Sequence, residues 1–158
     1  MGWFSTDYSK GAVEVTGAWV ADKFREAGFH RVGPSGESAT KDDHYLVLTR
    51  ENLSALVFKH HDTMQLAYHD SSAEFPDCDD FAVCAEADIL KGAIKSRLKF
   101  APVFAYCVVQ RKQTGAAHAL IAAIDDDGVC LYEPQKRDSP EPWIYDLKVF
   151  ERLLGVDP

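Results

Sequence analysis

The chain has 158 residues, of which 46% are hydrophobic and 27% are charged, and its formal net charge is −8. This composition is typical of a folded globular protein, and the acidic balance argues against nucleic acid as a ligand. The sequence has no run of about 18 apolar residues that could span a bilayer, and its start lacks the basic and apolar regions of a secretory signal. We therefore expect a single domain over residues 1–158, located in the cytoplasm.

Two short elements are predicted in the first third of the chain. Val20 and Phe24 recur at helical spacing, and Gly28 is a residue type that often follows a helix, so residues 17–27 are expected to form a helix. After a segment rich in turn-forming residues, the apolar stretch HYLVL over residues 44–48 predicts a strand.

Two further helices are predicted on either side of an irregular segment. Residues 49–60 begin with Thr49, whose side chain is suited to cap a helix. Residues 78–97 carry a stripe of apolar side chains, which predicts the longest helix of the chain. Asp79 and Asp80 in its first turn support this helix start, because acids stabilise the positive end of the helix dipole.

The second half of the chain is rich in predicted strands, at residues 103–110, 117–124 and 129–135. The acidic run that ends in Gly128, between the last two strands, predicts a hairpin turn. Residues 143–155 are expected to form a brief strand and then a C-terminal helix. The predicted fold class is α+β, with helices packed on an antiparallel sheet.

The predicted hairpin determines which side chains are neighbours. If residues 125–128 form the loop, His118 lies opposite Gln135, and Glu133 is diagonally adjacent on the same face. A loop of two residues would change the partner directly opposite His118. Side chains two positions apart on a strand would still share that face, so we expect an imidazole with either Glu133 or Gln135 beside it.

Cys78 is the candidate nucleophile, because it stands at a predicted helix start where unpaired N–H groups and the helix dipole lower the pKa of a thiol. His118 could act as the general base, with Glu133 or Gln135 orienting its ring. The same residues also fit a structural role, as a buried cysteine, a sheet histidine and a solvent-facing strand residue. The spacing leaves both interpretations open.

Three acids flank this cysteine in the stretch FPDCDDFA, residues 75–82. Asp77 is placed to cap the helix, whereas Asp79 and Asp80 either turn away from the thiol or gather a divalent cation. Carboxylate oxygens are suitable ligands for a divalent cation, so Asp77, Asp79 and Asp80 form the candidate metal site.

Three blocks of sequence occur in a recognisable order: DCDDFA at residues 77–82, AHALIA at 117–122 and YEPQ at 132–135. Together with the stretch YLVLTRENLSALV at residues 45–57, they resemble the papain-like cysteine peptidase domain found at the C-terminus of the fungal Marasmius oreades agglutinin and in small bacterial and phage proteins. The resemblance covers residues 44–135.

This resemblance implies a papain-like fold in which Cys78 is the nucleophile, His118 the general base and Glu133 the orienting acid. It also implies activation by a calcium-type divalent ion. The lectin repeats of the agglutinin are absent from this chain, so glycan binding is not implied. A looser similarity in the order of cysteine and histidine links the chain to NlpC/P60 peptidoglycan hydrolases, although their cysteine motif usually reads DCSG rather than DCDD.

These observations lead to one preferred hypothesis and several alternatives. The preferred function is a cysteine hydrolase that cleaves peptide or amide bonds in a peptide or protein substrate through a thioester intermediate. The first alternative is a catalytically idle papain-like domain that binds a protein partner, or serves as a phage, bacterial or effector-associated structural protein. The same thioester would permit acyl transfer to an amine. The NlpC/P60 similarity makes a cell-wall peptide an alternative substrate.

Overall fold

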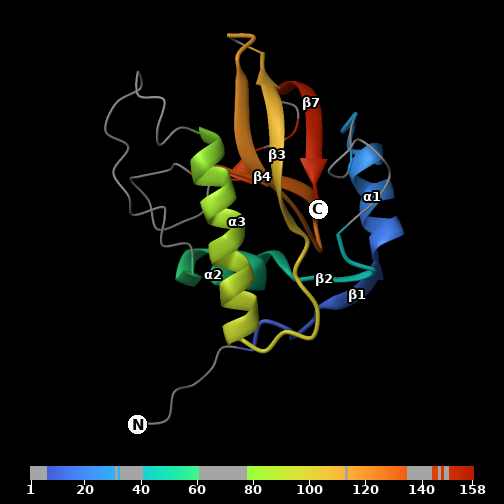
Figure 1. Ribbon diagram of the computed structural model, residues 1–158. Helices are drawn as coiled ribbons and strands as arrows, with labels where there is room; N and C mark the ends of the chain where they lie inside the picture. The colour runs from blue at the N-terminus through green and yellow to red at the C-terminus, as the bar shows by residue number, and fades with distance from the viewer. Residues whose placement is uncertain are drawn as a thin grey trace.

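The structure is a computed structural model that describes residues 7–30, 32, 41–60, 78–112, 114–134, 144–145, 147 and 150–158. The described residues form three helices and seven strands (Figure 1): β1 (Val13–Thr16), α1 (Gly17–Glu26), β2 (His44–Val47), α2 (Arg50–His60), α3 (Cys78–Lys95), β3 (Phe104–Arg111), β4 (Ala117–Asp125), β5 (Gly128–Tyr132), β6 (Ile144–Tyr145) and β7 (Phe150–Asp157). The predicted α+β class is confirmed, and none of these helices is long and apolar enough to cross a membrane.

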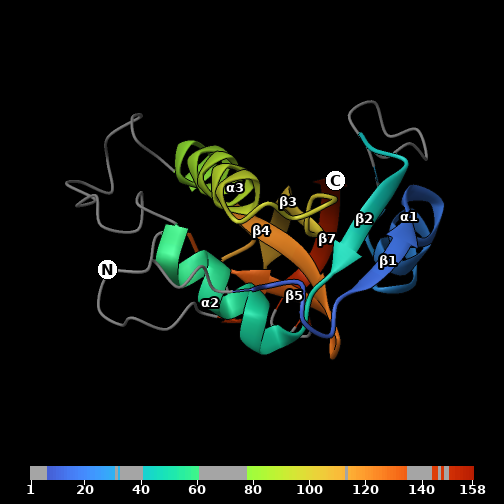
Figure 2. The same cartoon turned by 90° about the horizontal axis from the view of Figure 1, so that it is seen from below.

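A five-stranded antiparallel sheet in the order β6-β5-β4-β3-β7 forms the centre of the fold, and β1 pairs with β2 in a separate two-stranded sheet. Successive side chains of β4 point to opposite faces. Ala119 and Ile121 pack in a core cluster with α2 and α3, whereas Leu120 and Ala122 belong to a second cluster with α1. Figure 1 and Figure 2 show these helices on the two sides of the sheet.

The helix starts follow from local capping. The side chain of Thr16 accepts a hydrogen bond from the backbone N–H of Trp19 at the start of α1, at 3.2 Å. At the start of α2, the side chain of Thr49 accepts a hydrogen bond from the backbone N–H of Asn52, as predicted for a threonine in this position. After α1, Gly28 adopts a φ of 100°, a conformation that favours glycine. All three predicted helices are confirmed, with ends within two residues of those expected.

The prediction was wrong in the C-terminal segment, which forms β7, paired with β3, instead of a helix. The buried residues Leu153 and Val156 are three positions apart, a spacing that is typical of a helix. A register shift explains this spacing, because Val108 pairs with Gly155 and Val109 with Leu153, which leaves one extra residue in β7. The brief strand predicted before this segment is confirmed as β6.

The pairing register of the β4–β5 hairpin determines how the candidate site residues on these strands lie relative to one another. Asp125 pairs with Gly128 and Ile121 pairs with Tyr132, as the predicted loop requires. Gly128 adopts a φ of 118°, which suits a residue without a Cβ. β5 ends at Tyr132, earlier than predicted, and Gln135 lies outside the described residues.

Candidate functional site

Cys78 is the first residue of α3, and it is half-buried. The backbone N–H of Ala119, on β4, donates a hydrogen bond to the Cys78 Sγ at 3.4 Å. This contact joins the start of α3 to the strand that carries His118. The predicted position of Cys78 at a helix start is confirmed.

His118 and Glu133 form a buried pair at one end of the strands of the central sheet, where β4 begins and β5 ends, and this end is called the site edge below. Their side chains are 7% and 9% exposed, and His118 Nε2 lies 2.8 Å from Glu133 Oε2. His118 is near the beginning of β4 and Glu133 directly follows β5, so the hairpin register brings them together. A hydrogen bond of this length to a carboxylate holds the imidazole ring in one orientation. The predicted proximity of the two side chains is confirmed.

Arg111, at the end of β3, is a neighbour that the sequence analysis missed. Its Nη2 lies 3.9 Å from Glu133 Oε2, and its side chain is 46% exposed. Its backbone N–H donates to the carbonyl of Ala116, so the short β3–β4 connection holds Arg111 at the site edge. That connection is visible in the sequence as a polar segment between two apolar runs, and it could have pointed to Arg111.

The thiol and the imidazole approach the site edge from different sides of β4. Ala119 packs in the same core cluster as Cys78, on the side of α3. Its neighbour His118 leaves the strand on the opposite face, because successive side chains alternate. The thiol therefore contacts the backbone of the strand, whereas the imidazole contacts Glu133. Donors and acceptors arranged around a nearly buried pair can hold the polar groups of a ligand.

The other predicted site residues are only partly described. Asp79 is exposed and Asp80 is half-buried, both in the first turn of α3. Asp77 and Gln135 lie outside the described residues. In the part of the chain that the structure describes, no group of three or more His, Cys, Asp or Glu side chains could hold a metal ion. The Ca²⁺ site at Asp77, Asp79 and Asp80 stays a prediction.

Comparison with known proteins bears on the fold. No protein-family model and no curated protein sequence matches the chain. Among solved structures, the chain is similar to a complex of PSL1a with E64, with a TM-score of 0.65 and 21% sequence identity over 90% of this chain and 49% of that chain. It is also similar to the Polyporus squamosus lectin bound to the human-type influenza-binding epitope Neu5Acα2-6Galβ1-4GlcNAc, with a TM-score of 0.59 and 23% identity over 84% of this chain and 48% of the lectin. The chain thus spans about half the length of these similar proteins.

These similarities correct the predicted activity. The similar structures are those of a lectin, which is a binding protein, so the prediction of an enzyme of the cysteine hydrolase or thiol protease kind is contradicted. A peptide substrate is not supported. The resemblance to a fungal agglutinin holds at the level of the fold, whereas the papain-like peptidase type is not shown. The physical reason for the error is that a thiol, an imidazole and a carboxylate can serve binding as well as catalysis.

Proposed function

We propose that the chain is a catalytically idle binding domain on a papain-like scaffold, and that Cys78, His118 and Glu133 contact a carbohydrate ligand. The observation that carries this proposal is the similarity to a lectin structure over 84% of the chain. That lectin is bound to a sialylated trisaccharide. The chain covers 48% of the lectin, and lectin repeats were not found in its sequence, so we assign carbohydrate contact to Cys78, His118 and Glu133 instead.

The chemistry of the site supports a polyhydroxylated ligand. Sugar hydroxyl groups both donate and accept hydrogen bonds, and a carboxylate, an imidazole and a guanidinium offer complementary partners. Glu133 and His118 are nearly buried, whereas Arg111 and Cys78 are more exposed and can form the rim of the site. Polar groups that are fixed in place at the base of a site give a ligand its orientation and the site its specificity.

The charges of the site bear on the kind of sugar that would bind. At physiological ionic strength, charges more than about 8 Å apart are largely screened, so the net charge of −8 does not decide whether an anionic sugar binds. Arg111 supplies a cation at the rim, 3.9 Å from Glu133. A ligand carboxylate beside Arg111 would gain a charge-assisted hydrogen bond. The Glu133 carboxylate would repel the same group and offset part of this gain, so we expect a sialylated sugar to bind about as tightly as its neutral counterpart.

Calorimetric titration with Neu5Acα2-6Galβ1-4GlcNAc and with Galβ1-4GlcNAc tests this function. We expect saturable binding with a Kd of about 0.1–1 mM. His118→Ala and Glu133→Ala are each expected to raise the Kd at least about fivefold, because each removes a polar group at the base of the site. Arg25→Ala is the matched control, since Arg25 pairs with the exposed Asp22 on α1.

Two results would contradict this function. The first is the absence of saturable heat with both sugars at protein concentrations of about 0.2 mM, which would leave a protein partner as the better candidate ligand. The second is turnover of a peptide substrate that is lost in Cys78→Ala, because the domain would then not be catalytically idle.

A further inference from the structure

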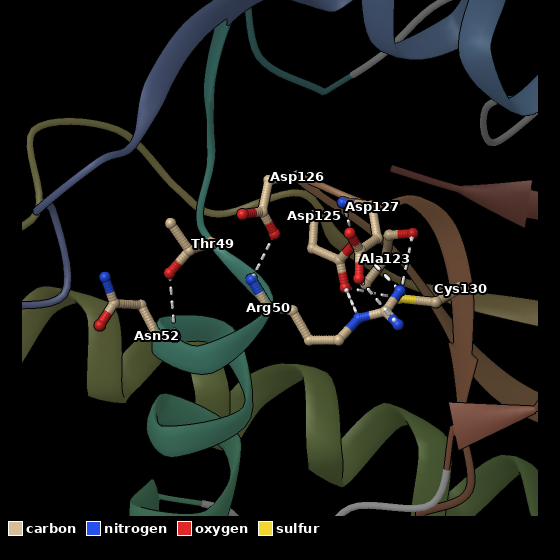
Figure 3. A network of polar contacts seen from close by, with 8 residues as sticks. All are labelled: Thr49, Arg50, Asn52, Ala123, Asp125, Asp126, Asp127 and Cys130. Carbon is tan, nitrogen blue, oxygen red and sulfur yellow. Dashed lines mark hydrogen bonds and ion pairs between the residues drawn. The ribbon is translucent and has the colours of Figure 1, made fainter.

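Arg50, the first residue of α2, binds all three acids of the β4–β5 turn (Figure 3). Its Nε and Nη2 lie 2.9 and 3.3 Å from the two carboxylate oxygens of Asp125. Its Nη1 lies 3.1 Å from Asp127 Oδ2, and its backbone N–H donates to Asp126 Oδ1 at 2.7 Å. Both the side chain and the backbone of Arg50 therefore attach the start of α2 to the turn.

Asp125 is the centre of this network. Its side chain is 0% exposed, and it also accepts hydrogen bonds from the backbone N–H of Asp127 at 2.9 Å and from the Cys130 thiol at 3.5 Å. Burial, together with the Asp125 carboxylate, raises the pKa of Cys130, so this thiol stays protonated and can donate. Removing one partner from a buried carboxylate leaves its charge uncompensated. Loss of the Arg50 guanidinium should therefore destabilise the folded protein.

The contact does more than cap a helix. Thr49 already caps α2 through its own side chain, so Asp126, which is remote in the sequence, is a second acceptor at the same helix start. A guanidinium that contacts a carboxylate through two nitrogens fixes the direction of approach as well as the distance. The sequence pattern indicates only a turn for the three acids, because Arg50 lies 75 residues before Asp125.

The helix layer, formed by α2 and α3, is attached to β4 at two places. At the turn end, Arg50 holds the Asp125 carboxylate. Toward the other end of the strand, the Ala119 N–H donates to Cys78 Sγ at 3.4 Å. Between these places α2 packs on α3, and α3 packs along β4. A displacement of the helix layer at the turn would therefore be passed to Cys78 through packed side chains.

We propose that Arg50 is a positioning residue for the ligand site: by holding the β4–β5 turn, it sets where the helix layer lies on β4 and therefore where Cys78 stands relative to His118. This inference rests on the proposed function, because it takes the cluster of Cys78, His118 and Glu133 as the ligand site. Its test measures the reactivity of the Cys78 thiol and not ligand binding, so either proposal can fail while the other stands.

Site-resolved alkylation with iodoacetamide, followed by peptide mass spectrometry, reports how Cys78 is held. Cys84, which is exposed on α3, is the internal standard. Arg50→Met is expected to raise the ratio of the Cys78 to the Cys84 labelling rate at least about fivefold, because a loosened helix layer uncovers the half-buried thiol. Arg25→Met, which removes a surface arginine on α1, is the matched control and should leave the ratio unchanged.

The double variant Arg50→Met/Asp125→Asn separates positioning from stability. Asp125→Asn removes the buried charge that Arg50→Met leaves unpaired, so part of the lost melting temperature should be regained. The guanidinium contacts with the turn stay broken, so the labelling ratio should stay high. A ratio that returns to the wild-type value together with the melting temperature would overturn the proposal, because Arg50 would then act through stability alone.

Arg50→Lys covers the case in which Arg50→Met does not fold. An ammonium keeps the positive charge but cannot make the two-nitrogen contact with Asp125. We expect a folded protein whose labelling ratio is raised at least about twofold. A wild-type ratio in folded Arg50→Lys, or in folded Arg50→Met, contradicts the proposal.

Discussion

At the scale of single residues, the candidate site depends on the hydrogen bond between His118 and Glu133. Their side chains are 7% and 9% exposed, so water can replace a lost partner only poorly. A buried polar group that loses its hydrogen-bond partner has also lost its hydration, so the folded state is destabilised by the desolvation free energy of that group. The pair therefore contributes to the stability of the site edge as well as to its chemistry.

Glu133→Ala is expected to lower the free energy of unfolding by about 1–3 kcal/mol, because it leaves a buried imidazole nitrogen without its partner. Glu133→Gln keeps an acceptor oxygen, so the loss should be smaller. Glu26→Ala is the control: Glu26 pairs with Lys23 on the surface, and its loss should change stability by less than about 0.5 kcal/mol. Urea unfolding measures all three, and a Glu133→Ala variant as stable as wild type would refute this role of the pair.

The neighbours within the site could be predicted where they follow from local structure. The helix start at Cys78 follows from the acids in its first turn, and the contact between His118 and Glu133 follows from the hairpin loop. Arg111 and the Ala119 amide were missed because their positions depend on how β3 pairs and how α3 packs. The activity could not be read from these residue types, because they suit both binding and catalysis.

At the scale of elements, α2 and α3 approach closely where Gly92 faces His60. A Cβ on Gly92 would lie 2.6 Å from the His60 ring, closer than carbon atoms can approach without displacement. Glycine weakens a helix relative to alanine. The close approach of the two helices therefore explains why glycine is suited to this position in α3.

Gly92→Ala is expected to lower the free energy of unfolding by about 1–3 kcal/mol, because overpacking outweighs a gain of roughly 1 kcal/mol in helix propensity. In a His60→Ala background the same change should be neutral or stabilising, since the obstructing ring is gone. Urea unfolding of wild type, both single variants and the double variant gives the interaction energy. If the two substitutions change the free energy of unfolding additively, the contact between Gly92 and His60 is not the cause of the destabilisation.

The elements that could be predicted are those with a regular local pattern. α3 has an apolar stripe and acids in its first turn, and β4 is a long apolar run next to a clear turn. β1 was not predicted, because its four residues include no fully buried position and therefore show no buried face. β7 was predicted as a helix, because the extra residue between Leu153 and Gly155 breaks the alternation of a strand.

At the scale of the whole molecule, the central sheet is covered on both faces, and this coverage buries thiols as well as aliphatic side chains. Cys107 is 0% exposed in the core cluster beside α1, and Cys130 is 2% exposed in the cluster beside α2 and α3. Burial raises the pKa of both thiols, and the Asp125 carboxylate adds to the effect at Cys130. Both cysteines are therefore neutral core residues at physiological pH.

Stability is expected to fall as the pH rises above about 8.5, where thiols of the unfolded chain ionise. Because the pKa values of Cys107 and Cys130 are raised in the folded state, the folded protein then binds more protons than the unfolded chain. The free energy of unfolding therefore decreases with pH, and the contribution of these thiols is fully present only below the unfolded-state value.

Urea unfolding between about pH 7 and pH 10.5 measures this dependence. Cys107→Ala should make the decrease shallower, because one titrating thiol is removed. Val109→Ala is the matched control, since it truncates a buried residue of the same core cluster that carries no thiol. Identical pH slopes for the two variants would show that Cys107 does not contribute to the decrease.

Titration of the isotope-labelled protein with Neu5Acα2-6Galβ1-4GlcNAc, followed by NMR, tests most directly whether the site edge, where Cys78, His118 and Glu133 lie, binds a carbohydrate. We predict saturable shifts of the Ala119 amide and the His118 ring that fit one Kd, while the amides of α1 stay unchanged. Signals of Ala119 and His118 that do not move at saturating sugar, or shifts confined to other parts of the chain, would contradict this prediction.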